Sequence, residues 1–109
     1  MLGCNTSNSD TPGTAEVLPA VAQAVRDRVC VLVDGGIRSG ADVLKCLALG
    51  ADAVLVGRPL AIAAIGGRGE GVRLQLERLR EELFTAMLMT GCPSPSRAGS
   101  HLLHPPAPA

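Results

Sequence analysis

Two short apolar runs that end in the same kind of loop constrain the fold more than any other feature of this chain. The run at 29–33 leads into D-G-G-I-R at 34–38, and the run at 53–56 leads into G-R-P at 57–59. Continuous β-branched runs are typical of buried parallel strands covered on both faces, and we expect the first run not to be an edge strand. The segment between them is long enough for a right-handed crossover. The pattern predicts a βαβ unit with both loops at one edge of the sheet.

Helix signals surround the two runs. Ser39 and Asp42 match a capping box, and the apolar face that follows stops at Gly50, a good left-handed cap. Upstream, a helix is expected to open at Thr14 or Leu18, with a proline in its first turn, where a missing N–H matters little. These signals place one helix before the first strand and one between the strands.

The C-terminal half shows a different periodicity. A short helix is expected from Pro59 to Ile65, followed by a flexible break in the glycine-rich GGRGEG at 66–71. Apolar residues then recur every three or four positions from Val72, with Arg–Glu pairs at i,i+4, which predicts a helix to about Thr90. Gly91 should end it. The order of elements indicates an α/β fold with a parallel sheet, in three parts: an irregular segment 1–13, a folded segment 14–91 and a proline-rich disordered tail 92–109.

Composition excludes several classes of partner. Ten basic and ten acidic residues give no net charge, and one Phe without Trp or Tyr offers no stacking platform, so no nucleic acid is expected. No apolar run reaches the ~18 residues of a membrane span, and no signal peptide is evident. The four cysteines lack metal or redox spacing, so we expect no metal, a cytoplasmic location, and inert core thiols at Cys30 and Cys46.

The two loops have the chemistry of a phosphate site. Gly35 and Gly36 let a ligand approach the backbone, so that the amides around 37–40 can turn toward an anion. The helices that follow each loop present positive ends, and Arg38 and Arg58 supply guanidinium forks. In the alternative interpretation, Arg38 is a solvated loop residue and Arg58 pairs with a nearby carboxylate, Asp34 or Asp52. Asp34 either binds ligand hydroxyls or caps the loop amides.

The stretch VDGGIRSGADVLKCLALGADAVLVGRP, together with LREELFTAMLMTGC at 79–92 and TPGTAEVLPAVAQAV at 11–25, resembles the FMN-dependent α-hydroxy-acid dehydrogenases and oxidases, the family of glycolate oxidase and lactate oxidase. The resemblance covers about residues 11–92. It implies FMN as cofactor, L-2-hydroxy acids as substrates, hydride transfer to the flavin, and the last part of a TIM (β/α)₈ barrel as the fold. The positions that match the FMN-holding segments are Asp34, Gly35, Gly36, Ile37, Arg38, Gly57 and Arg58.

One motif of that family is missing. The His-Gly-(Ala/Gly)-Arg segment that should carry the catalytic base and the substrate-carboxylate arginine does not precede Thr11, and His101 and His104 lie in the tail. No catalytic residue is therefore assigned, and the chain is expected to be inactive alone. With 109 residues it falls far short of the ~250 of a closed barrel. Exposed apolar faces and strand edges would then favour association, including a homo-oligomer.

Two other classes of function stay open. Type 2 isopentenyl diphosphate isomerase and IMP dehydrogenase carry similar phosphate loops, so the segment could belong to another flavin- or nucleotide-binding barrel. Alternatively the chain is a non-catalytic phosphate-binding or interaction module that completes a sheet with another chain.

Overall fold

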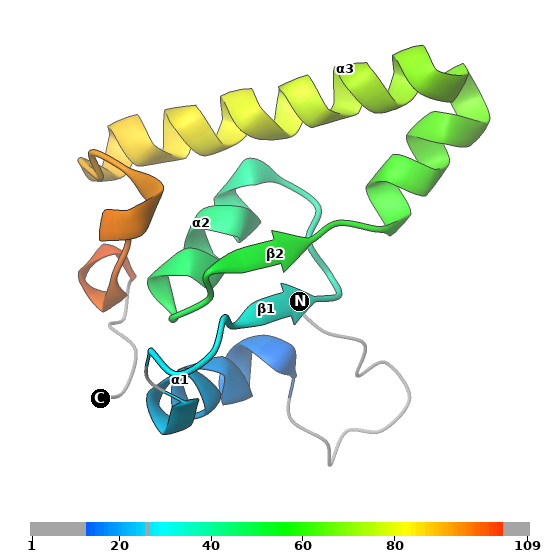
Figure 1. The fold of residues 1–109 in the computed structure, drawn as a ribbon. Helices are drawn as coiled ribbons and strands as arrows, with labels where there is room; N and C mark the ends of the chain where they lie inside the picture. Colours follow the sequence, from blue (N-terminus) through cyan, green and yellow to red (C-terminus); the bar gives the residue numbers. More distant parts are fainter. Residues whose placement is uncertain (1–12, 26, 104–109) are drawn as a thin grey trace.

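The computed structural model describes residues 13–25 and 27–103, in which helices and strands alternate (Figure 1). The elements are α1 (Thr14–Val25), β1 (Leu32–Asp34), α2 (Gly40–Ala48), β2 (Ala53–Leu55), α3 (Arg58–Thr90) and two single-turn 3₁₀ helices, η1 (Pro95–Arg97) and η2 (Ser100–Leu102). The expected irregular segment lies outside the described residues except for Gly13, as do His104 and the rest of the tail.

The two strands form a parallel pair, as the crossover length predicts. Val33 lies opposite Val54, and Asp34 lies opposite Leu55. Val31 extends the contact, because its carbonyl accepts the N–H of Asp52 at 2.8 Å. Strand β1 begins at Leu32, three residues later than expected. The segment that leads into β2 turns at Gly50, whose φ is 118°. Within the described residues, no extended backbone therefore lies beside residues 29–30 to pair with them.

The hydrophobic core lies on one face of this sheet. Val33 is 2% exposed. It packs with Leu18 of α1, with Ile37 of the loop after β1 and with Cys46 of α2. Partly buried residues surround these side chains, namely Ala15, Val31, Val43, Leu49, Val54 and Val56. Alternate residues of both strands thus point to the helices, as the pleat of a strand dictates.

The opposite face of the sheet is open, which corrects the expectation of strands buried on both faces. Leu32 is 58% exposed and Leu55 is 50% exposed. The strand residues that point to either face of the sheet are apolar, but the described residues supply a helical layer on only one face. Cys30 is also exposed, so its prediction as a core thiol is wrong, whereas Cys46 is fully buried as expected.

Helix α1 begins at the earlier of its two expected positions. The N–H of Glu16 donates to the carbonyl of Gly13 at 3.1 Å, which starts the helix at Thr14. Pro19 consequently lies inside the helix and not in its first turn. At this interior position it removes one backbone hydrogen bond. Burial of Leu18, next to Pro19, still fixes the helix against the core.

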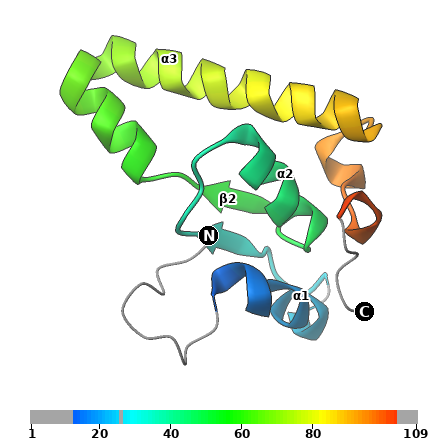
Figure 2. The ribbon, with the colours of Figure 1, turned by 180° about the vertical axis from the view of Figure 1, so that it is seen from behind.

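Helices α2 and α3 approach one another at a glycine. A Cβ atom at Gly40 would overlap the backbone nitrogen of Leu83 and backbone atoms of Glu82 and Leu79. Leu79 is the buried residue of α3, and in both views α3 runs past the outer side of α2 (Figures 1 and 2). The first residue of α2 therefore has to be a glycine for the two backbones to meet.

The glycine-rich segment contains the predicted break, but the break is a sharp kink at a single residue with helix on both sides. Only Arg68 leaves the helical conformation, with φ 52° and ψ −142°. A Cβ at Gly71 would overlap the carbonyl oxygen of Ala63, so the two halves of α3 meet closely across the kink. Beyond it, the helix ends as predicted at Gly91, in the left-handed conformation with φ 73°.

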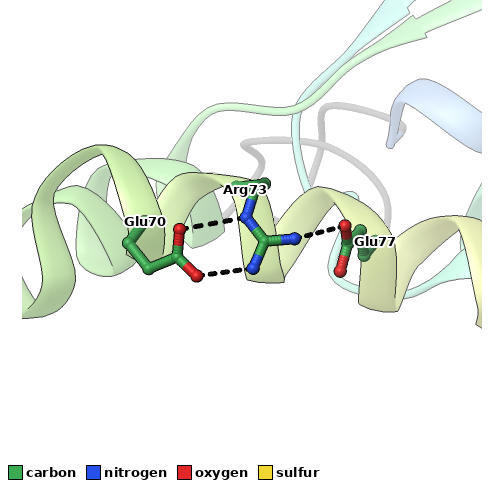
Figure 3. A network of polar contacts seen from close by, with 3 residues as sticks. All are labelled: Glu70, Arg73 and Glu77. Carbon is green, nitrogen blue, oxygen red and sulfur yellow. Dashed lines mark hydrogen bonds and ion pairs between the residues drawn. The ribbon is translucent and has the colours of Figure 1, made fainter.

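An exposed ionic network lies just after the kink (Figure 3). Arg73 contacts Glu70 through two nitrogens, one of them Nε at 3.0 Å, and its third nitrogen contacts Glu77. Hydrogen bonding to Arg73 lowers the pKa of Glu70. The expected pair of Arg78 with Glu82 is present at 3.6 Å. Exposed i,i+3 and i,i+4 pairs of this kind contribute little to stability, because water and salt screen the charges.

After α3 the chain returns toward α2. Cys92 is buried, and η1 and η2 both contact α2. The tail expected to be disordered from residue 92 thus carries two helical turns through Leu102, while the three-part division of the chain stays a prediction. Among the described helices none has the length and apolar character needed to cross a membrane.

Candidate phosphate-binding site

Both glycine loops leave the same end of the sheet. Strands β1 and β2 run in one direction, and the pairing of Asp34 with Leu55 brings their last residues level. The connections to α2 and α3 start side by side at the arrowheads in both views (Figures 1 and 2). The structure therefore brings the two sequence segments together at the carboxyl edge, where parallel sheets commonly bind ligands.

The first loop owes its shape to its glycines. Gly35 has φ 101° and Gly36 has φ 76°, values that residues with a Cβ rarely adopt. Ile37 follows with its side chain in the core, only 3% exposed. Ile37 can thus face a ligand only with its backbone, and it anchors the loop between the exposed side chains of Asp34 and Arg38.

The backbone of Arg38 is fixed by the helix cap. Its N–H donates to Asp42 Oδ2 at 3.1 Å, and the N–H of Asp42 donates to Ser39 Oγ at 3.3 Å. The predicted capping box is present, but the carboxylate reaches one residue further back than the motif predicts. The Arg38 amide is consequently occupied, and the expectation that all amides around 37–40 turn toward an anion is wrong at this position.

The second loop is open and short. Gly57 precedes α3, and apart from its own atoms and those of its chain neighbours no atom lies within 4 Å of the position that a Cβ would take there. Arg58 is exposed and is the first residue of α3, which begins one residue before the predicted start at Pro59. The free space at Gly57 and the positive end of α3 together suit a negatively charged group.

Neither arginine is held by a carboxylate within the described part of the chain. The ion pairs there all lie on α3 and involve Arg73 or Arg78. Asp52, one suggested partner of Arg58, instead accepts the N–H of Val31 at 2.8 Å. The alternative interpretation, with Arg58 paired to Asp34 or Asp52, therefore has no support in residues 13–25 and 27–103, and both guanidinium groups are available to a ligand.

The described residues do not form a metal site. They contain no cluster of three or more His, Cys, Asp or Glu side chains able to hold a metal ion. His101 is exposed on η2. Two features of the site were not predicted from the sequence. One is the burial of the Ile37 side chain, and the other is the hydrogen bond from the Arg38 amide to Asp42, for which the capping pattern of Ser39 and Asp42 was the signal.

The sequence model of the FMN-dependent dehydrogenase family matches residues 7–105. Relatives include a peroxisomal (S)-2-hydroxyacid oxidase of Arabidopsis thaliana, 48% identical over 77% of this chain and 23% of its own length. Mouse 2-hydroxyacid oxidase 1 is 52% identical over 74% of this chain and 22% of its own. L-lactate oxidase of Lacticaseibacillus rhamnosus is 47% identical over 74% and 22%.

Solved structures agree with these relatives. Mandelate oxidase with benzoyl-formic acid superposes with a TM-score of 0.75 and 52% identity, over 77% of this chain and 25% of that protein. A mandelate oxidase mutant with a monooxide FMN adduct gives a TM-score of 0.76 at the same identity. The chain spans about a quarter or less of the length of the proteins that it matches.

Proposed function

Because the chain belongs to the family of FMN-dependent dehydrogenases, we propose that its two loops hold the phosphate of FMN. The observation that carries this proposal is the juxtaposition of two glycine loops at one sheet edge, each with an arginine that no described carboxylate neutralises. The residues assigned to the site are Asp34, Gly35, Gly36, Ile37, Arg38, Gly57 and Arg58.

The glycines, the arginines and Asp34 have different parts in the proposed site. Gly35 and Gly36 shape the loop, and Gly57 leaves room for the phosphate oxygens. Arg38 and Arg58 supply charge-assisted hydrogen bonds, the strongest kind available to a phosphate. Asp34, which lies opposite Leu55 at the end of β2, is proposed to accept hydrogen bonds from the hydroxyls of the flavin side chain. Bound FMN would supply a hydride acceptor.

For the whole protein we propose oxidation of L-2-hydroxy acids with hydride transfer to FMN. The relatives include oxidases of 2-hydroxy acids and of lactate. We assign this chain only the binding half of that activity, because its described residues offer no buried histidine at the sheet edge to serve as a base. The fold is accordingly proposed as the last part of a (β/α)₈ barrel. The cytoplasmic location stays a prediction, and two relatives from Arabidopsis thaliana are named as peroxisomal.

Equilibrium titration tests the phosphate assignment. FMN should bind the wild-type chain more tightly than riboflavin, which has the same ring system without the phosphate. Arg38→Ala and Arg58→Ala should each reduce the FMN affinity about tenfold, the effect of losing one charge-assisted hydrogen bond, and leave riboflavin unchanged. Arg80→Ala, an exposed arginine on α3, is the control. Equal affinities of the wild-type chain for FMN and riboflavin would refute the assignment.

The open sheet face supports a second candidate function. Leu32 and Leu55 leave an apolar surface on β1 and β2, and within the described residues each strand has a single neighbour. Such a surface suits a module that completes its sheet with another chain. In that case the chain should elute as an assembly in sizing chromatography, and a strictly monomeric chain with cooperative unfolding would contradict this candidate.

A further inference from the structure

We propose that Asp42 is a positioning residue for the phosphate site, acting through the backbone of Arg38. The inference rests on the proposed function, since it describes how the first loop is held ready for the anion. Its physical basis is the hydrogen bond from the Arg38 N–H to Asp42 Oδ2 at 3.1 Å. Asp42 itself does not touch the phosphate.

The bond fixes the point from which the Arg38 side chain starts. Residues 35 and 36 occupy left-handed conformations and have no side chains to restrict them. Ile37, before Arg38, is anchored in the core, and Asp42 holds the Arg38 N–H, which belongs to the peptide between these two residues. After Arg38 the chain enters α2 at Gly40, which packs against the backbone of α3. The guanidinium thus projects from a backbone fixed at both ends, so less conformational freedom is lost when it meets a phosphate.

Asp42 also opposes the anion that it helps to bind. Its carboxylate lies in the first turn of α2, where it offsets the positive end of the helix that would attract a phosphate. The residue therefore has two separable effects: the hydrogen bond promotes binding, and the negative charge weakens it. An amide side chain keeps an acceptor oxygen and removes the charge, whereas a methyl group removes both.

A pair of substitutions separates these effects. In titrations of the full chain with FMN, Asp42→Asn should bind at least as tightly as wild type. Asp42→Ala should bind about fivefold more weakly than Asp42→Asn, because the two variants have equal charge and differ in one hydrogen bond. Riboflavin should bind all three chains equally. Ser39→Ala removes the other half of the cap without touching the Arg38 bond, and should leave the ratio of FMN to riboflavin affinity unchanged.

The outcomes keep this inference apart from the proposed function. If wild type does not prefer FMN over riboflavin, the phosphate site itself is wrong. If wild type prefers FMN but Asp42→Asn and Asp42→Ala bind it equally, Asp42 does not position Arg38 and the inference fails. The inference would also be overturned if Ser39→Ala bound FMN as weakly as Asp42→Ala does. General fraying of α2 would then explain the loss in both variants.

Amide hydrogen exchange tests the same inference on the wild-type chain alone, without any substitution. Amide hydrogen exchange followed by NMR should show the Arg38 N–H protected in the free chain, and equally protected after FMN is added. An Arg38 amide that exchanges freely without FMN and becomes protected only with it would show that the phosphate, and not Asp42, accepts this hydrogen. That result would overturn the inference even if Asp42→Ala does not fold.

Discussion

Gly40 shows how a single missing methyl group determines the packing of two helices. Gly40→Ala would push a Cβ into the backbone of α3, and overlaps with backbone cannot be relieved by rotating a side chain. We expect a loss of about 1–3 kcal/mol in the free energy of unfolding, measured by urea denaturation. Gly66→Ala is the matched control: no atom lies near its Cβ position, and alanine in a helix should stabilise by about 0.5–1 kcal/mol. Equal effects of the two substitutions would contradict the close approach of α2 and α3.

The buried thiol of Cys46 links stability to pH. Burial, and secondarily the charge of Asp42, raises the pKa of Cys46 above its ordinary value of 9.0. The folded state therefore holds this proton more tightly than the unfolded state. The corresponding stability is fully present below about pH 9, and it is lost as pH rises from the unfolded pKa through the folded pKa.

This linkage predicts a difference in slope between two chains. Above pH 9 the free energy of unfolding of wild type should fall more steeply with pH than that of Cys46→Ala, by at most about 1.4 kcal/mol per pH unit. Comparing slopes removes the constant cost of the lost side chain. Parallel pH profiles would show that Cys46 ionises as readily in the folded chain as in the unfolded one.

Among the elements, α3 carries the most evident strain. Arg68 lies at the kink with φ 52° and ψ −142°, a conformation available mainly to glycine, and its neighbours on both sides are glycines. Arg68→Gly should raise the free energy of unfolding by about 1 kcal/mol in urea denaturation. Arg68→Ala keeps a Cβ at the same φ and should give no comparable gain. A destabilising Arg68→Gly substitution would show that the kink is not strained.

The elements also show where sequence reasoning works and where it stops. Local chemistry determines the caps at Ser39 and Gly91, and the sequence predicts both. The parallel pair followed from the crossover length. Exposure of Leu32 and Cys30 did not follow, because an apolar strand sequence does not record whether a second layer is present to cover it. The glycines of 66–71 predicted the break in α3, but not that it narrows to Arg68, because the close approach of Gly71 to the Ala63 carbonyl depends on how the two halves of α3 fold together.

The candidate site divides in the same way. The glycines and arginines of both loops could be identified from residue type and position, and their meeting at one edge followed from the parallel arrangement. Two features could be found only from the structure: the Ile37 side chain lies in the core, and the Arg38 amide donates to Asp42. Both depend on the rotation of the loop about its backbone, which two glycines leave undetermined in the sequence.

For the molecule as a whole, the open face of the sheet should govern association. We expect the chain to self-associate through this face, and the double substitution Leu32→Thr with Leu55→Thr should shift sedimentation toward the monomer at equal concentration. Threonine retains strand propensity, so the sheet itself should persist. Leu74→Thr, equally exposed but on α3, is the control and should leave the distribution unchanged. Identical behaviour of all three chains would place any association elsewhere.

The central claim is that the two loops bind one phosphate group together. The most direct test is an NMR titration of the ¹⁵N-labelled chain with FMN, which follows every backbone amide at once. The claim predicts that signals from residues 35–39 and from Gly57 and Arg58 shift together with a single dissociation constant, and that riboflavin reproduces neither set of shifts. Shifts confined to one loop, or two loops that saturate at different FMN concentrations, would contradict it.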